Sequence, residues 1–158
     1  MIGREDKKDN DLFFTCSLID YIARKTKNKR LLVIQKLGKH KIEKIYDLAD
    51  IYHSYQINQV ADEFIEQVGI QEGNYDNVIE CKYSIPTHWD IGKVYKRLIL
   101  GVSDVKNIGV IDALFEVYES FICELIDDYN GSFYYENPKY ILETFLSGKI
   151  EGYCVKQI

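Results

Sequence analysis

DLFFTCSLIDYIARKTKN, residues 11–28, carries apolar side chains at the three- and four-residue spacing of an amphipathic α-helix. Asp20, Arg24 and Lys25 are expected on the opposite, solvent-facing side. Asn10 or Asp11 is a suitable N-cap, so the pattern predicts a helix that begins near this point. The expected buried stripe consists of Leu12, Phe13, Cys16, Ile19, Ile22 and Ala23.

The same periodicity recurs through most of the chain. A final helix is predicted to start at Pro138 after an Asn137 cap and to end at Gly148. The strongest periodic signal lies at 105–129. We therefore predict an all-α fold, a small multi-helix bundle of about six to seven helices. The other predicted helices cover residues 31–38, 39–53, 58–69, 88–100 and 105–129.

Two segments leave a β alternative open. Asn130–Gly131 is a dipeptide typical of hairpin turns, and three aromatic residues follow it. Residues 78–85 are consistent with a short extended piece. The fold prediction therefore includes one short β-hairpin or extended segment.

Turn-forming residues divide the chain near its middle. Gly69, Gly73, Asn74 and Asn77 indicate a linker over 69–77. The predicted organisation is an N-terminal helical lobe at 1–70 and a C-terminal helical lobe at 78–158. Because 158 residues suit a single domain of ordinary size, we expect both lobes to belong to one compact domain.

Charge is distributed unevenly along the chain. Residues 1–44 hold 12 Lys or Arg against 6 Asp or Glu, whereas residues 45–158 hold 8 against 19, and the net charge is −5. The acidic majority favours a basic protein partner over nucleic acid. No apolar run reaches the roughly 18–20 residues of a membrane span, and the charged start lacks the apolar segment of a signal peptide. We expect a cytoplasmic protein without a membrane interaction.

The residue types that carry chemistry are scattered. Cys16 and Cys123 fall on predicted apolar faces and are expected in the core. His40, His53 and His88 lack the H-E-x-x-H spacing of a zinc site, and no glycine-rich phosphate loop or G-x-S-x-G elbow is present. The sequence therefore predicts no metal, no cofactor and no enzymatic activity. No C-x-x-C pair joins the four cysteines, Cys16, Cys81, Cys123 and Cys154.

SIPTHWDIGKVYKRLI, residues 84–99, combines a helix start with unusual side chains. Thr87 and Asp90 fit a capping box, and Pro86 stiffens the approach to it. Capping does not account for an indole and an imidazole in the first turn. Trp89 at this place either anchors the helix on the first bundle or serves as an interface hot spot. The candidate partner-binding residues are His88, Trp89, Lys93, Tyr134 and Tyr135.

Two alternatives use other residues. The run ARKTKNKR, 23–30, can neutralise phosphates, so a DNA-binding regulator using residues 23–45 is one alternative, although KIEKIYDLADIYH turns acidic. An enzyme with a site around His88, Asp90 and nearby tyrosines is the other. The candidate nucleic-acid-binding residues are Arg24, Lys25, Lys27, Lys29 and Arg30.

Residues 13–70 resemble the small uncharacterised bacterial family DUF3791. The shared features are an apolar and aromatic first helix ending in a Tyr-x-Ala-basic pattern, a middle Lys-x-Gly turn, and a Tyr-His pair followed by a helix rich in acidic residues. Members of that family look like companions of small toxin-like proteins. The resemblance implies a protein-binding module, the antitoxin or immunity partner of a toxin-like protein, and transfers no catalytic residue.

Overall fold

The computed structural model describes residues 2–148, and this range is entirely helical, without a strand. The predicted all-α fold is confirmed. None of the described helices combines the length and apolarity needed to cross a bilayer. The α-helices are α1 (Ile2–Thr26), α2 (Arg30–Asp47), α3 (Ala49–Tyr52), α4 (Ile57–Val68), α5 (His88–Lys106), α6 (Val110–Tyr118), α7 (Ile122–Ile126) and α8 (Pro138–Ser147), with the 3-10 helix η1 (Phe133–Tyr135) before α8.

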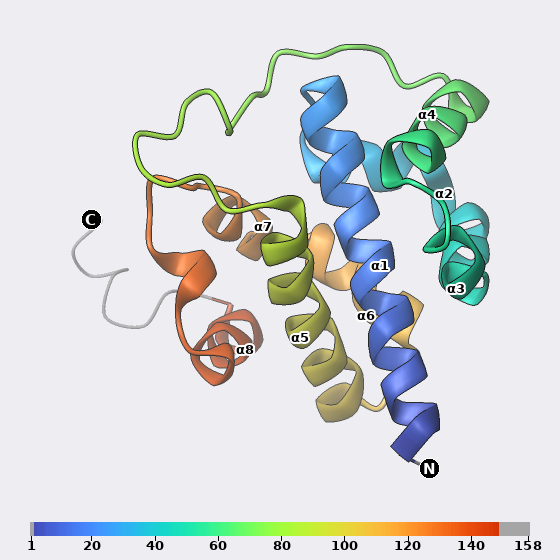
Figure 1. Cartoon of the computed structure of the whole chain (residues 1–158). Coiled ribbons are helices and arrows are strands. Elements are labelled where there is room, and N and C mark those ends of the chain that lie inside the picture. Colours follow the sequence, from blue (N-terminus) through green and yellow to red (C-terminus); the bar gives the residue numbers. More distant parts are fainter. Residues whose placement is uncertain (1, 149–158) are drawn as a thin grey trace.

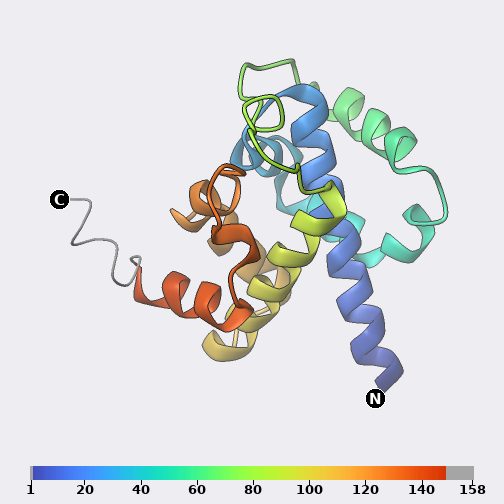
Figure 2. The same cartoon turned by 60° about the vertical axis from the view of Figure 1, so that its left-hand side comes forward.

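Helix α1 lies at the centre of the molecule (Figure 1). It packs most extensively against α5, while α2, α3 and α4 pack on its other side. Helix α6 contacts both α5 and α2, and α8 packs against α5. The turned view in Figure 2 shows the order α8, α5, α1, α4 across the molecule.

One hydrophobic cluster fills the spaces between these helices. It includes Ile19 of α1, Ile45 of α2, Ile99 of α5 and Val117 of α6, all fully buried. The helices of the two predicted lobes, 1–70 and 78–158, therefore contribute to the same core. Cys16 and Cys123 are buried in it, as predicted.

Helices α1 and α5 approach closely at Gly92. A Cβ atom there would overlap Oγ of Ser17 and lie 2.9 Å from the Cα and the backbone N of Ser17. Both residues are buried. The close contact between the two central helices thus depends on the absence of a side chain at position 92.

Several predicted helix ends are confirmed. Thr87 Oγ1 accepts from the backbone N–H of Asp90 (3.0 Å), and the Asp90 carboxylate accepts from the N–H of Thr87 (2.9 Å), which completes the capping box. Asn137 Oδ1 accepts from the N–H of Lys139 (2.8 Å) at the start of α8. Gly38 interrupts α2 with φ +78°, a conformation that glycine adopts without strain.

The beginning of α1 differs from the prediction. The helix starts at Ile2, so Asn10 and Asp11 lie inside it and neither is its N-cap. Asp11 instead accepts from Lys7 Nζ at 3.2 Å, an i,i+4 pair that supports the added turns. Asp20, expected on the solvent face of this helix, is fully buried.

The predicted boundary of α5 near residue 100 is wrong. The helix continues through Gly101, where a Cβ would lie 3.0 Å from Leu142 of α8, so the missing side chain lets α8 pack closely. It ends at Lys106, and the C-cap residue Asn107 has a left-handed conformation with φ 55°. The Oγ of Ser103 donates to the carbonyl of Ile108 (2.6 Å) and stabilises the turn.

The single helix predicted over 105–129 is also wrong, because the chain turns twice within it. The first turn is the one at Asn107 that ends α5. The second turn is at Ser120, whose Oγ donates to the carbonyl of Val117 (2.7 Å) and accepts from the N–H of Ile122 (3.2 Å). Both α6 and α7 bury an apolar face. Their apolar residues follow one another in the sequence with the periodicity of a single long helix.

The hairpin alternative is not realised, and residues 78–85 form no strand. A hairpin turn of the Asn-Gly type needs positive φ at both central residues, and neither Asn130 nor Gly131 has it. Asn130 instead binds the segment before α5: its Oδ1 accepts from the N–H of Lys82 (2.7 Å) and its Nδ2 donates to the carbonyl of Glu80 (3.0 Å). The aromatic residues that follow form η1.

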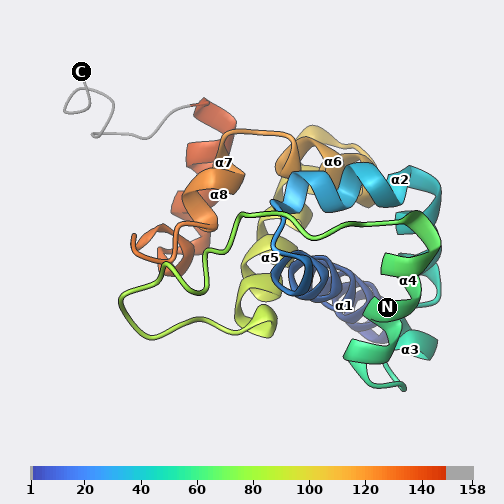
Figure 3. The ribbon, with the colours of Figure 1, turned by 90° about the horizontal axis from the view of Figure 1, so that it is seen from above.

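The connector, residues 69–87, joins α4 to α5 without regular structure. Seen from above in Figure 3, it crosses the ends of α1 and α2. The N–H of Gly73 donates to the carbonyl of Thr26 (2.8 Å), and that of Tyr75 to the carbonyl of Lys27 (2.9 Å). These bonds fasten the predicted linker to the end of α1.

Candidate protein-binding groove

The candidate partner-binding residues lie in two places. Lys93, Tyr134 and Tyr135 line a groove beside α5. His88 and Trp89, although they precede Lys93 on the same helix, pack against α1. Three of the five residues therefore line a surface groove, and the other two pack between helices.

Trp89 and His88 belong to an aromatic cluster between α5 and α1. The ring of Trp89 lies 5.5 Å from that of Phe13 and stacks on His53 at 5.7 Å. His88 meets the edge of Tyr21 at 5.0 Å. Burial, with the nearby Arg24 charge, lowers the pKa of His88 and so favours its neutral form.

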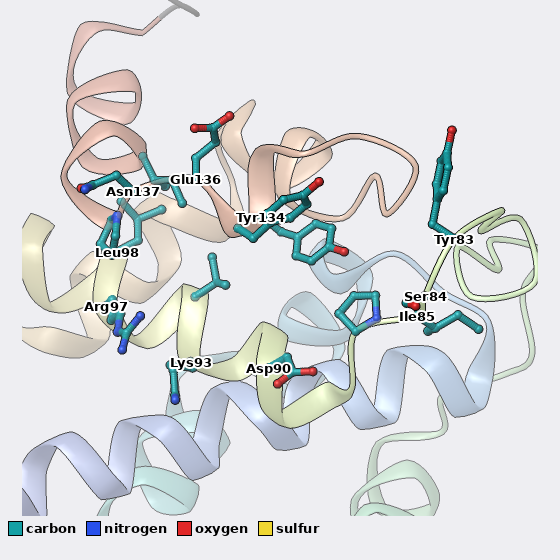
Figure 4. Close-up of a pocket in the computed structure, with 15 residues that line it drawn as sticks. Tyr83, Ser84, Ile85, Asp90, Lys93, Arg97, Leu98, Tyr134, Glu136 and Asn137 are labelled. Carbon is teal, nitrogen blue, oxygen red and sulfur yellow. The ribbon is translucent and has the colours of Figure 1, made fainter.

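The groove lies between α5, the end of the connector and the segment from η1 into α8, and has a volume of about 910 Å³. Figure 4 shows Asp90, Lys93, Arg97 and Leu98 along one side and Tyr134, Glu136 and Asn137 along the other, with Ser84 and Ile85 at one end. Its apolar lining comes from Ile85, Pro86, Val94, Leu98, Pro138 and Ile141.

Local sequence explains how each side of the groove is built. Spacings of three and four residues put Asp90, Lys93 and Arg97 on one face of α5. The capping box fixes where that helix begins, and Pro86 before it is buried. Pro138 follows the Asn137 cap, so the far side begins at an equally well-defined point.

Tyrosines form the exposed wall of the groove. Tyr134 makes edge contacts with Tyr129 (5.8 Å) and Tyr135 (4.8 Å), and burial raises its pKa. Tyr135 is 69% exposed, Tyr83 is 68% exposed and Ile85 is 47% exposed. Several large exposed side chains along one groove are typical of interaction sites.

The cations of the groove are uncommitted. Asp90 is occupied by the capping box. Neither Lys93 nor Arg97 has a hydrogen bond or ion pair within residues 7–148, and both are exposed. On the same helix, Lys96 is held by Asp9 at 2.6 Å, so the free cations are those that face the groove.

The basic side chains of the run 23–30, unlike those of the groove, are paired with acidic residues or turned inward. Lys25 pairs with Asp62 at 2.6 Å, Lys27 with Glu72 at 3.5 Å and Lys29 with Glu124 at 3.8 Å. Arg24 and Arg30 turn inward, and Arg30 is fully buried. Arg30 therefore has no access to a phosphate backbone, and the other four already have acidic or phenolic partners.

Both inward arginines bind one carboxylate. Arg24 Nε lies 2.7 Å from Asp20 Oδ2, and Arg30 Nε lies 2.7 Å from Asp20 Oδ1. The same arginines donate from Nη2 to the Tyr129 hydroxyl, at 3.0 and 3.1 Å. Asn77 links the connector to this group, because its Nδ2 donates to the carbonyl of Asp127 (2.8 Å). We refer to Asp20, Arg24, Arg30, Asn77, Tyr95, Cys123, Asp127 and Tyr129 as the buried polar cluster.

Asp127 forms the other end of the buried polar cluster. The hydroxyl of Tyr95 donates to its Oδ1 at 2.9 Å, the thiol of Cys123 lies 3.2 Å from its Oδ2, and Arg30 Nε lies 3.9 Å away. Burial raises the pKa of Asp127 to about 6 even though Arg30 acts in the opposite direction. Because these groups are bonded to one another and almost entirely enclosed, the cluster links α1, α2, α5 and α7 and presents no open site.

Other reactive groups are equally enclosed. Burial raises the pKa of Cys16 to about 12 and also raises that of Cys123, so neither thiol ionises near neutral pH. Within the described part of the chain, no three His, Cys, Asp or Glu side chains gather in a way that could hold a metal ion.

Sequence reasoning missed part of the groove and all of the buried polar cluster. Arg97 follows Lys93 by four residues, a spacing that already places both cations on one side of the helix. Pro138 and Ile141 reach the groove only through the packing of α8 on α5, which no local pattern shows. Asp20 was placed on the solvent face because its partners Arg30 and Tyr129 come from other elements.

Comparison with known proteins gives no match to a family model, to a curated protein or to a solved structure. The resemblance to DUF3791 therefore stays a prediction.

Proposed function

We propose that this protein is a protein-binding module that holds an extended segment of a partner protein in the groove beside α5. The observation that carries the proposal is the groove itself, with exposed tyrosines and uncommitted cations on sides that are fixed by two capped helix starts. Interfaces are enriched in Tyr and Arg, which supports this use.

The dimensions of the groove suit a short extended segment. Its α5 side runs from Asp90 to Leu98, which corresponds to about 12 Å along a helix axis. An extended chain covers that length with about four residues. Tyrosine and proline walls are the type of surface on which extended, proline-containing segments dock.

The resemblance to DUF3791 supports a more specific proposal, in which the partner is a toxin-like protein and this chain is its antitoxin or immunity partner. Co-expression of a toxin-like protein encoded beside this chain should then restore growth that the toxin-like protein alone inhibits. A gene neighbourhood without such a protein, or growth inhibition that persists, would rule this proposal out.

The two alternatives receive less support from the geometry. A DNA-binding surface over 23–45 would have to do without Arg30, which is buried, and would compete with the acidic partners of Lys25, Lys27 and Lys29. An enzymatic site at His88 and Asp90 would use a histidine packed on Tyr21 and a carboxylate engaged in a helix cap.

The proposal is tested by selecting ligands from a phage-displayed library of random short peptides on the full chain. Affinities of the selected peptides are then measured by calorimetry. Tyr135→Ala should weaken binding at least about tenfold, as expected for an interface aromatic residue. Tyr55→Ala is the matched control, since Tyr55 is similarly exposed (60%) but lies outside the groove. Failure to select a peptide, or equal effects of the two substitutions, would contradict the proposal.

A further inference from the structure

The free cations of the groove bear on the chemistry of the segment that it binds. We infer that this segment is acidic at one end, with a carboxylate between Lys93 and Arg97 and a proline or aliphatic residue against Tyr134 and Ile85. This inference rests on the proposed function and specifies its ligand.

Arg97 is the strongest argument for a carboxylate. Among the arginine side chains that the structure describes, in residues 7–148, Arg24 and Arg30 are bound by Asp20, whereas Arg97 has no ion pair or hydrogen bond in that range. A guanidinium presents paired N–H donors that match the two oxygens of a carboxylate. Lys93, one turn earlier on the same face of α5, adds a second charge within reach of the same group.

The acidic side chains that line the groove do not neutralise the end that holds Lys93 and Arg97. Asp90 lies nearer the start of α5 and is occupied by the N–H of Thr87. Glu136 lies on the opposite rim, and in Figure 4 its carboxylate points away from Lys93 and Arg97. The start of α8 borders the same end, with a neutral cap at Asn137 and no acidic residue in its first turn.

The other end of the groove is apolar. Ile85, Pro86 and Tyr134 line the groove there, and none of the three is basic. A proline or aliphatic side chain would cover these surfaces at little cost in conformational entropy. The local side chains thus favour an acidic segment, in contrast to the basic partner expected from the net charge.

The inference is tested on peptides selected with the same phage-displayed library of random short peptides. Enrichment of Asp or Glu next to Pro or aliphatic residues is expected. The double substitution Lys93→Glu with Arg97→Glu should weaken their binding at least about thirtyfold, and raising the salt concentration should weaken binding to the unmodified chain. Lys36→Glu with Lys44→Glu is the charge-matched control, since both lysines are exposed on α2 outside this groove, and it should change affinity less than about threefold.

The outcomes separate this inference from the proposed function. Selected peptides that lack acidic residues, or that bind the two double variants equally well, would overturn the inference; if they still lose affinity with Tyr135→Ala, the groove remains a protein-binding site. Peptides insensitive to Tyr135→Ala would overturn both. Binding of a second copy of this chain, seen as a dimer that Lys93→Glu with Arg97→Glu dissociates, would also overturn the inference.

Discussion

The buried polar cluster and the groove both bring tyrosines and charged side chains together, but they satisfy them differently. In the cluster, Asp20 binds two arginines and Tyr129 accepts from both of them. In the groove, Lys93 and Arg97 have no partner among the described residues, and Tyr135 is exposed. The difference shows where this chain uses polar groups for stability and where it leaves them available for binding.

The largest expected effect comes from breaking the buried polar cluster at its centre. Asp20→Ala leaves Arg30 buried without its closest carboxylate and should lower the free energy of unfolding by about 3–5 kcal/mol. Urea denaturation followed by circular dichroism measures this change. Asp62→Ala, which removes an exposed partner of Lys25, is the control and should cost less than about 1 kcal/mol. Similar losses for the two variants would show that the cluster does not stabilise the fold.

A second test uses pH, because the pKa of Asp127 rises from 3.8 to about 6 on burial. The folded state then holds this proton more tightly than the unfolded state, so the contribution of Asp127 is most favourable below about pH 4 and is lost as pH rises through 6. The size of the loss is about 3 kcal/mol.

Asp127→Asn isolates this contribution from those of other carboxylates. The free energy of unfolding of the unmodified chain minus that of the variant should fall between pH 4 and pH 6.5 and stay level above it. A difference that is constant over this range, or that rises with pH, would contradict the raised pKa of Asp127.

The same chemical change can be made in both regions. Tyr95→Phe removes the hydroxyl that donates to buried Asp127 and should cost about 1–3 kcal/mol of unfolding free energy. Tyr135→Phe removes an exposed hydroxyl and should change it by less than about 0.5 kcal/mol. Thermal or urea denaturation of the two variants gives the comparison directly, and equal costs would mean that the groove also contributes to stability.

The smallest effect is expected for the groove cations. Arg97→Ala and Lys93→Ala should each leave the unfolding free energy within about 0.5 kcal/mol, because neither side chain has an intramolecular ion pair among the described residues. Differential scanning calorimetry would detect a larger change. A loss above about 1 kcal/mol would indicate that these cations stabilise the helix and are not free for a ligand.

Features set by neighbouring residues were predicted from the sequence. The all-α fold follows from apolar periodicity, and the caps at Thr87 and Asn137 involve residues only two or three positions away. The predicted length of the helix over 105–129 was wrong because periodicity does not register the turns at Asn107 and Ser120, where a left-handed residue and a side-chain hydroxyl redirect the chain.

The candidate site was predicted only in part for a related reason. Lys93, Tyr134 and Tyr135 were identified by their type and their setting, but the surface that joins them depends on how α8 packs against α5. Trp89 and His88 were added as candidates because capping did not explain them, but the helix turns these two rings toward α1, which agrees with the alternative in which Trp89 anchors the helix. Neighbouring positions on a helix point in different directions, so nearness in sequence alone does not place residues on one surface.

The connector has a consequence for how the molecule unfolds. Gly73 and Tyr75 bind the end of α1, Asn77 reaches the carbonyl of Asp127, and Asn130 fixes Glu80 and Lys82. A segment that resembles a flexible link in the sequence is therefore tied to both halves of the chain. We expect the two halves to melt as one cooperative unit, since neither can open without releasing the connector from the other.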